Sequence, residues 1–160
     1  MKRVLLFCFI ICLSFTVSAQ DFASRFLQKH ESDTNLTCIS ISPKMMEEVL
    51  KIDADGDNKM MDMISKLKSM QMLKAETNSQ KYYKEALSLL NKNSGRFESF
   101  LSFDDKSENC QILVRKKKGR ILELVMLICE ANSFVVINFT GNMNDDFITK
   151  LANSIEFKHS

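Results

Sequence analysis

The second half of the chain contains four consecutive strand-like runs, and no other feature constrains the fold as strongly. The runs cover residues 97–103, 110–116, 121–129 and 134–140, and they are rich in β-branched and other apolar side chains. Short polar connections separate them, which is typical of strands joined one to the next by hairpins. This half is therefore predicted to form a four-stranded antiparallel meander.

The first half and the C-terminal end add helices and one or two further strands. Two extended runs, residues 35–42 and 67–73, predict strands. Capping residues precede stretches with helical apolar spacing, and they predict helices that begin at five places: Asp21, Ser42, Asp57, Asn78 and Asp145. The most economical fold class is α+β, with two layers in which helices cover one face of a largely antiparallel sheet.

The N-terminus has the pattern of a signal peptide. A basic start and an apolar run over residues 4–17 precede a small-residue cleavage signal that ends at Ala19. The run is shorter than the roughly 20 residues that a membrane span needs. We expect residues 1–19 to be removed and residues 20–160 to form a single α+β domain in the periplasm or the extracellular space. No cysteine follows the cleavage site, so a lipoprotein is not expected.

Removal of the signal peptide changes the charge of the chain. The sequence has 22 basic and 20 acidic residues, and loss of Lys2 and Arg3 leaves 20 of each, so the net charge falls from +2 to zero. A balanced chain lacks the long-range attraction to phosphate on which nucleic-acid binding depends. A nucleic-acid partner is therefore not expected. The charge-free stretches that follow the signal peptide are short, so stable membrane insertion is not expected either.

An acidic loop between two predicted helices suggests a calcium site. Its carboxylates stand at alternate positions: Asp53, Asp55 and Asp57. If Gly56 is the required loop glycine, Lys51 occupies the first ligand position, and if Asp53 comes first, Ile64 replaces the final glutamate. Neither register completes the coordination shell. A polar turn is favoured over a metal site.

Methionine is concentrated in the same region of the chain. Seven of the ten methionines lie between residues 45 and 72, at positions 45, 46, 60, 61, 63, 70 and 72. Thioethers can bind cuprous ion, but flexible methionines also fill irregular cores, and no histidine lies nearby in the sequence. Core packing is the favoured interpretation.

Three cysteines remain after the signal peptide: Cys38, Cys110 and Cys129. The odd number leaves at least one unpaired. Cys110 and Cys129 flank Gly119, so a hairpin with an even-length loop would place both on one face and permit a cross-strand disulfide. The alternative is that the thiols are buried and reduced.

The predicted hairpin tip is strongly basic. It carries five cations: Arg115, Lys116, Lys117, Lys118 and Arg120. Such a tip could contact an anionic surface or an acidic partner, although a solvated tip that discourages edge pairing is the commoner case.

The residue inventory does not indicate an enzyme. Both histidines, His30 and His159, stand at predicted element or chain ends, and no nucleophile elbow, zinc helix or phosphate-binding glycine loop occurs. Glu123 interrupts an apolar strand. It is expected to face solvent and to pair with Arg115 or Lys116 across the hairpin.

Several segments resemble one known family. They are FLQKH, CISISPKMMEEVL, ISKLKSMQML, ILVRKKKGRILELVMLI and VVINFTGNMNDDFITKLA. In their order they resemble the small exported bacterial family catalogued as domain of unknown function 4252, over nearly all of residues 20–157. The resemblance implies an envelope location in Gram-negative bacteria and a regulatory or stress-related role, because relatives often lie near genes for envelope-stress sigma factors. It implies no active-site residue. Many relatives look like lipoproteins, whereas this chain lacks the required cysteine.

Two functional hypotheses follow. The first is an exported, non-catalytic envelope protein that acts by contact with an unknown envelope protein, through an unpaired sheet edge for example, and uses no cofactor. The alternative is a periplasmic module that binds a small ligand or metal through the acidic loop or the methionine cluster. The sequence leaves the oligomeric state open.

Overall fold

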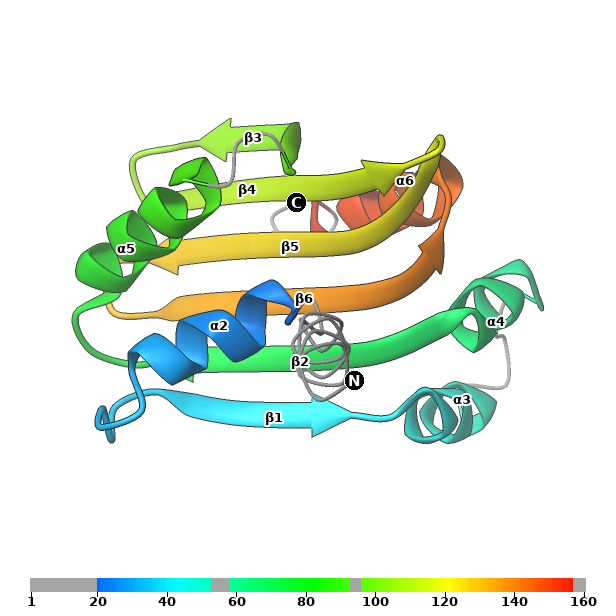
Figure 1. The fold of residues 1–160 in the computed structure, drawn as a ribbon, viewed down its shortest axis with the longest axis horizontal. Coiled ribbons are helices and arrows are strands. Elements are labelled where there is room, and N and C mark those ends of the chain that lie inside the picture. The colour runs from blue at the N-terminus through cyan, green and yellow to red at the C-terminus, as the bar shows by residue number, and fades with distance from the viewer. Residues whose placement is uncertain (1–19, 53–57, 93–95, 157–160) are drawn as a thin grey trace, which may run out of the picture.

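The computed structural model describes residues 20–52, 58–92 and 96–156, and its centre is one antiparallel sheet (Figure 1). The six strands run in the order β1-β2-β6-β5-β4-β3, and every neighbouring pair is antiparallel. Their bounds are β1 Thr37–Ile41, β2 Leu67–Ala75, β3 Glu98–Asp104, β4 Glu108–Lys117, β5 Arg120–Glu130 and β6 Phe134–Met143. The predicted four-stranded meander and the two N-terminal strands are confirmed, and the α+β class is confirmed with them.

Five helices accompany the sheet in the described part of the chain: α2 Phe22–Lys29, α3 Pro43–Ile52, α4 Asn58–Ser65, α5 Ser79–Lys92 and α6 Asp145–Glu156. Asp21 and Ser42 cap as predicted, because their side-chain oxygens accept from backbone amides three residues later. The predicted cap of α6 is wrong by one residue. Asn144 Oδ1 accepts from the Phe147 amide at 3.0 Å, and Asp145 is already helical. The predicted cap of α4, at position 57, lies outside the described residues.

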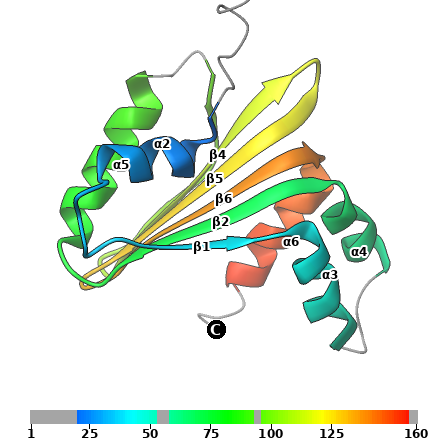
Figure 2. The ribbon, with the colours of Figure 1, turned by 60° about the horizontal axis from the view of Figure 1, so that its bottom comes forward.

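Helices pack on both faces of the sheet, so the prediction that they cover only one face is wrong (Figure 2). We call the face that bears α2 and α5 the front face and the other the back face. The front core includes Phe26, Tyr82 and Leu127, whereas the back core joins Ile148 of α6 to strand residues such as Leu124. Strand β5 is buried at nearly every position from 121 to 129, on both of its faces. Such a continuous apolar strand requires cover on both sides.

The hairpin between β4 and β5 combines a tight turn with a bulge. Lys118 and Gly119 have φ values of 52° and 76°, which is the left-handed pair that a two-residue type I′ turn requires. The register then shifts by one residue between Arg115 and Lys116. Because strand side chains alternate between faces, this shift exchanges the faces of residues beyond it relative to the turn.

Candidate functional site

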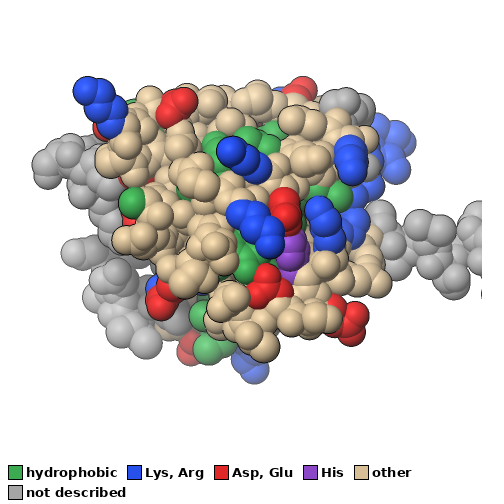
Figure 3. Space-filling view, turned by 90° about the vertical axis from the view of Figure 1, so that its left-hand side faces the viewer, with side chains coloured by type: hydrophobic (Ala, Val, Ile, Leu, Met, Phe, Trp, Pro, Cys, Tyr) green, Lys and Arg blue, Asp and Glu red, His purple; other side chains and the backbone are tan. Residues whose placement is uncertain are grey.

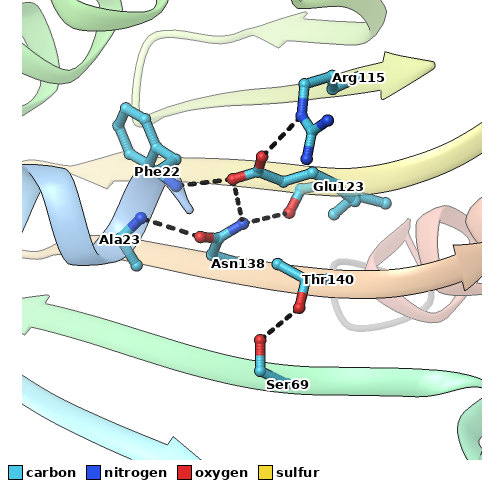
Figure 4. Close-up of polar contacts among 8 residues, drawn as sticks. Phe22, Ala23, Ser69, Arg115, Glu123, Asn138 and Thr140 are labelled. Atoms are coloured by element: carbon cyan, nitrogen blue, oxygen red, sulfur yellow. Dashed lines mark hydrogen bonds and ion pairs between the residues drawn. The ribbon is translucent and has the colours of Figure 1, made fainter. Parts of the chain in front are cut away.

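A buried carboxylate at the centre of the sheet holds the start of α2. Glu123 is fully buried, and its Oε1 accepts from the Phe22 amide at 2.6 Å and from Asn138 Nδ2 at 3.3 Å (Figure 4). Its other oxygen, Oε2, lies 3.0 Å from Arg115 Nε. The predicted pairing with Arg115 is confirmed. The predicted exposure of Glu123 is wrong, because the start of α2 lies against this carboxylate and Phe22 donates its amide to it.

The first three amides of α2 each have a separate side-chain acceptor. Phe22 N–H donates to Glu123, and Ala23 N–H donates to Asn138 Oδ1 at 2.9 Å (Figure 4). Ser24 N–H donates to Asp21 Oδ1 at 2.8 Å. Asn138 also donates to the Leu124 carbonyl at 3.0 Å. A helix N-terminus carries partial positive charge and orphan amides, so these acceptors stabilise it. Because the carboxylate and the amide are engaged by the fold itself, this cluster is suited to positioning α2 on the sheet.

A second polar cluster links the end of α2 to α5. His30 Nε2 lies 2.9 Å from Glu85 Oε2, and the imidazole packs against Phe26, with ring centroids 4.6 Å apart. The Tyr82 hydroxyl donates to Asp33, and this bond lowers the pKa of Asp33. Burial, reinforced by Asp33, raises the pKa of Tyr82 to about 12. Tyr82 therefore stays protonated at neutral pH and serves as a hydrogen-bond donor.

The surface around this second cluster is mixed in charge. Figure 3 shows that acidic and basic side chains alternate around a partly covered histidine, with scattered apolar atoms between them. Long-range steering of a charged ligand needs a field of one sign. This side of the molecule does not have the charge pattern of a site for a highly charged substrate.

Only some of the proposed metal ligands lie in the described part of the chain. The acidic loop, Asp53, Asp55 and Asp57, lies outside the described residues, so a site there stays a prediction. In the ranges that are described, no three His, Cys, Asp or Glu side chains gather in a way that could hold a metal ion. Met46, Met63 and Met70 pack against the back core, which supports the core-packing interpretation for these three.

The alternative of a Cys110–Cys129 disulfide is corrected by the strand register. Cys110 pairs with Ile128 and lies in the back core, whereas Cys129 pairs with Asn109 and lies in the front core. All three described cysteines are free. The loop is two residues long, as the disulfide required, but the register shift leaves Leu122 of β5 without a partner and reverses the face of the β5 residues that follow it.

Thiol titration should separate the three cysteines. Cys38 is exposed, whereas burial raises the pKa of Cys110 to about 11 and also raises that of Cys129. At pH 8 the native chain of residues 20–160, not treated with a reductant, is expected to react quickly with one equivalent of an aromatic disulfide reagent, and the unfolded chain with three. A Cys38→Ser variant should lose the fast reaction. Recovery of only one thiol after unfolding would indicate a disulfide between Cys110 and Cys129 and would contradict their assignment as free thiols.

The basic hairpin tip is smaller than the sequence suggested. Arg115 points to Glu123, and Lys116 Nζ lies 2.8 Å from Glu98 Oε1, an ion pair that raises the pKa of Lys116. The remaining cations, Lys117, Lys118 and Arg120, are exposed at the turn. A contact through these three residues stays a prediction.

Large exposed apolar side chains gather at the two edges of the sheet. Ile39 on β1 is 52% exposed, and Phe100 and Phe103 on β3 are 37% and 51% exposed. Among the described residues a fourth large apolar side chain is exposed, Met45, which lies at the start of α3, directly after β1. These residues were not predicted from the sequence, because an alternating apolar strand has the same pattern at the edge as in the middle of a sheet. The edges are the described surface best suited to binding another protein.

The chain is thus an α+β protein built on an open six-stranded antiparallel sheet with helices on both faces. The family model described as a domain of unknown function, DUF4252, matches residues 30–151, and the chain belongs to this family. No curated protein matches the chain. Among the helices that the structure describes, none combines the length and the apolar character needed to cross a bilayer.

Proposed function

We propose that this chain is an exported, non-catalytic envelope protein that acts by contact with another envelope protein. The observation that carries the proposal is the location of exposed apolar side chains on the edge strands β1 and β3. An edge strand offers unpaired backbone donors and acceptors to an incoming strand, and apolar side chains beside it add buried area.

The β3 edge is the part of this surface that best fits a different protein. Leu101 and Phe103 lie opposite Ile112 and Cys110 of β4, so the exposed Phe103 ring extends the back core outwards. Phe100 lies at a register shift in the same strand. Aromatic side chains contribute strongly to protein interfaces, because they bury a large area at a small entropic cost.

The non-catalytic part of the proposal is supported by the use of the buried polar groups. Glu123 binds the start of α2 and Arg115, and Tyr82 holds Asp33. A catalytic carboxylate or phenol must reach a substrate, whereas these groups are engaged within the fold. Export is supported by the signal-peptide pattern of residues 1–19, and a role in envelope stress or its regulation by the family resemblance.

The proposal is tested by cross-linking in the native envelope. A tagged chain with its own signal peptide is cross-linked, purified and analysed by mass spectrometry beside a tag-only control. Three variants accompany it: Phe100→Ser with Phe103→Ser at the edge, Lys117→Gln with Lys118→Gln and Arg120→Gln at the tip, and Lys84→Gln with Lys92→Gln on α5 as a matched surface control.

We expect one dominant partner that the edge variant loses and the α5 control retains. Loss in the tip variant alone would move the contact to the hairpin tip. The absence of any partner enriched over the tag-only control would overturn the contact function and return attention to metals and small ligands.

A further inference from the structure

In the part of the chain that the structure describes, the β1 edge lacks the charges and the register shift that protect the β3 edge against pairing. Strand β1 has the sequence TCISI, without a charged residue or proline, and it pairs with β2 in an unbroken register. Its first four residues are exposed. Natural sheet edges are usually guarded by charges, prolines or bulges, because an unguarded edge recruits another strand.

The β3 edge carries two of these guards. Glu98 and Asp104 stand at its two ends, and the register shift between Ser99 and Leu101 interrupts it. If β3 paired antiparallel with β3 of a second copy, Glu98 of each strand would stand opposite Asp104 of the other. Like charges in opposite positions destabilise a strand pair. Self-pairing of β1 brings no charges together.

We propose that β1 pairs antiparallel with β1 of a second copy of this chain, which joins two sheets into one of twelve strands. The inference rests on the proposed contact function and names the partner at one edge. The strand is centred on Ile39, so a two-fold axis there places Ile39 opposite itself and Cys38 opposite Ser40 of the other copy. Such a pairing is closed, because each copy uses the same surface.

The face of Ile39 makes this pairing favourable. Ile39 lies opposite Met72 of β2, which lies opposite Ile137 of β6, so it belongs to the back face. Opposed residues of an antiparallel pair share a face and stand about 4.5–5.5 Å apart at Cβ. Two half-exposed isoleucines would cover each other and continue the apolar back face from one copy to the next.

The contact is short, so the dimer is weak and depends on concentration. Five residues of strand span about 17 Å. A stable interface usually buries about 1,200–2,000 Å² in total, and one short strand pair with its side chains buries less.

The proposal is tested on the purified secreted chain alone, by sedimentation velocity. The protein concentration is varied about a hundredfold and extends to about the millimolar dissociation constants expected of small interfaces. We expect a monomer–dimer equilibrium. Ile39→Lys places two ammonium groups opposite each other and should raise the dissociation constant at least about tenfold. Phe103→Lys, a matched change at the other edge with similar exposure, should leave it unchanged.

Disulfide trapping tests the register without relying on affinity. In a Cys38→Ser background, Ile39→Cys is equilibrated with oxidised and reduced glutathione. Two thiols, one from each copy, then form one disulfide, while oxidised glutathione is reduced to two glutathione thiols. We expect a covalent dimer from Ile39→Cys, and none from Phe103→Cys in the same background.

Three outcomes would overturn the proposal. They are a monomer at every concentration, trapping through position 103 instead of 39, and larger species that both lysine variants abolish, which would indicate head-to-tail pairing of β1 with β3. A monomer in this experiment would not contradict a partner that is captured in the envelope experiment. Failure of that experiment, in turn, does not alter the sedimentation of the purified chain, so the two failures are distinguishable.

Discussion

Replacement of Gly141 by alanine is expected to lower the free energy of unfolding by about 3–5 kcal/mol, which combines backbone strain with an overpacked contact. Gly141 has a φ of 146°, a conformation that L residues rarely adopt. An added Cβ would lie 2.6 Å from the Lys66 carbonyl oxygen and 2.7 Å from Leu67 Cα, both of which are backbone atoms. Relief requires β2 and β6 to separate, and Lys66 also accepts from the Asn142 amide at this point. Urea unfolding followed by circular dichroism measures the change.

Gly119→Ala is the matched control for this prediction. Gly119 also has a positive φ, 76°, but an added Cβ would meet nothing within 4 Å. Its cost should therefore be that of the left-handed backbone alone, about 1 kcal/mol. Equal losses in the two variants would show that backbone conformation, and not the close approach to β2, sets the requirement for glycine at 141.

Replacement of Glu123 by alanine is the second large effect, with an expected loss of about 3–5 kcal/mol, as is usual when one partner of a buried ion pair is removed. The change leaves the Phe22 amide without its acceptor and Arg115 without its carboxylate. It also weakens the attachment of α2 to the sheet. We expect the variant to have a lower unfolding midpoint. Hydrogen–deuterium exchange should show that the substitution speeds amide exchange more in α2 than in β5.

Two controls locate the origin of the Glu123 effect. Glu98→Ala removes a carboxylate from an exposed ion pair with Lys116, and its expected cost is below about 1 kcal/mol. Glu123→Gln retains an oxygen acceptor while it removes the charge, so it should cost less than alanine. A loss for Glu123→Ala as small as that for Glu98→Ala would contradict the role assigned to the buried carboxylate.

The elements of the fold could be predicted because their signals are local. Asp21 and Ser42 cap the helices that they were expected to cap, and the residues that form β3 to β6 are rich in strand-forming side chains and end at turns. A cap acts within three residues of itself, and a hairpin within a few more. The presence of helices on both faces also had a local signal. Strand β5 is apolar at consecutive positions, a pattern of strands covered on both sides.

The surroundings of Glu123 and of the two buried cysteines could not be predicted in the same way. The burial of Glu123 depends on a helix whose contacting residue, Phe22, lies 101 positions earlier in the chain. The separation of Cys110 from Cys129 depends on one bulge at Leu122 of β5, which reverses the face of the rest of that strand. Neither effect has a signature in the residues that it moves.

The sequence by itself determined the α+β class, the order of the elements and the places where most of them begin. These properties follow from side-chain periodicity and capping, which act between near neighbours. Only the tertiary structure decided which strands are edges, which face each cysteine occupies, and that a glutamate within an apolar strand binds the start of a distant helix. These outcomes depend on pairings between residues far apart in the chain, where a shift of one residue exchanges the two faces of a strand.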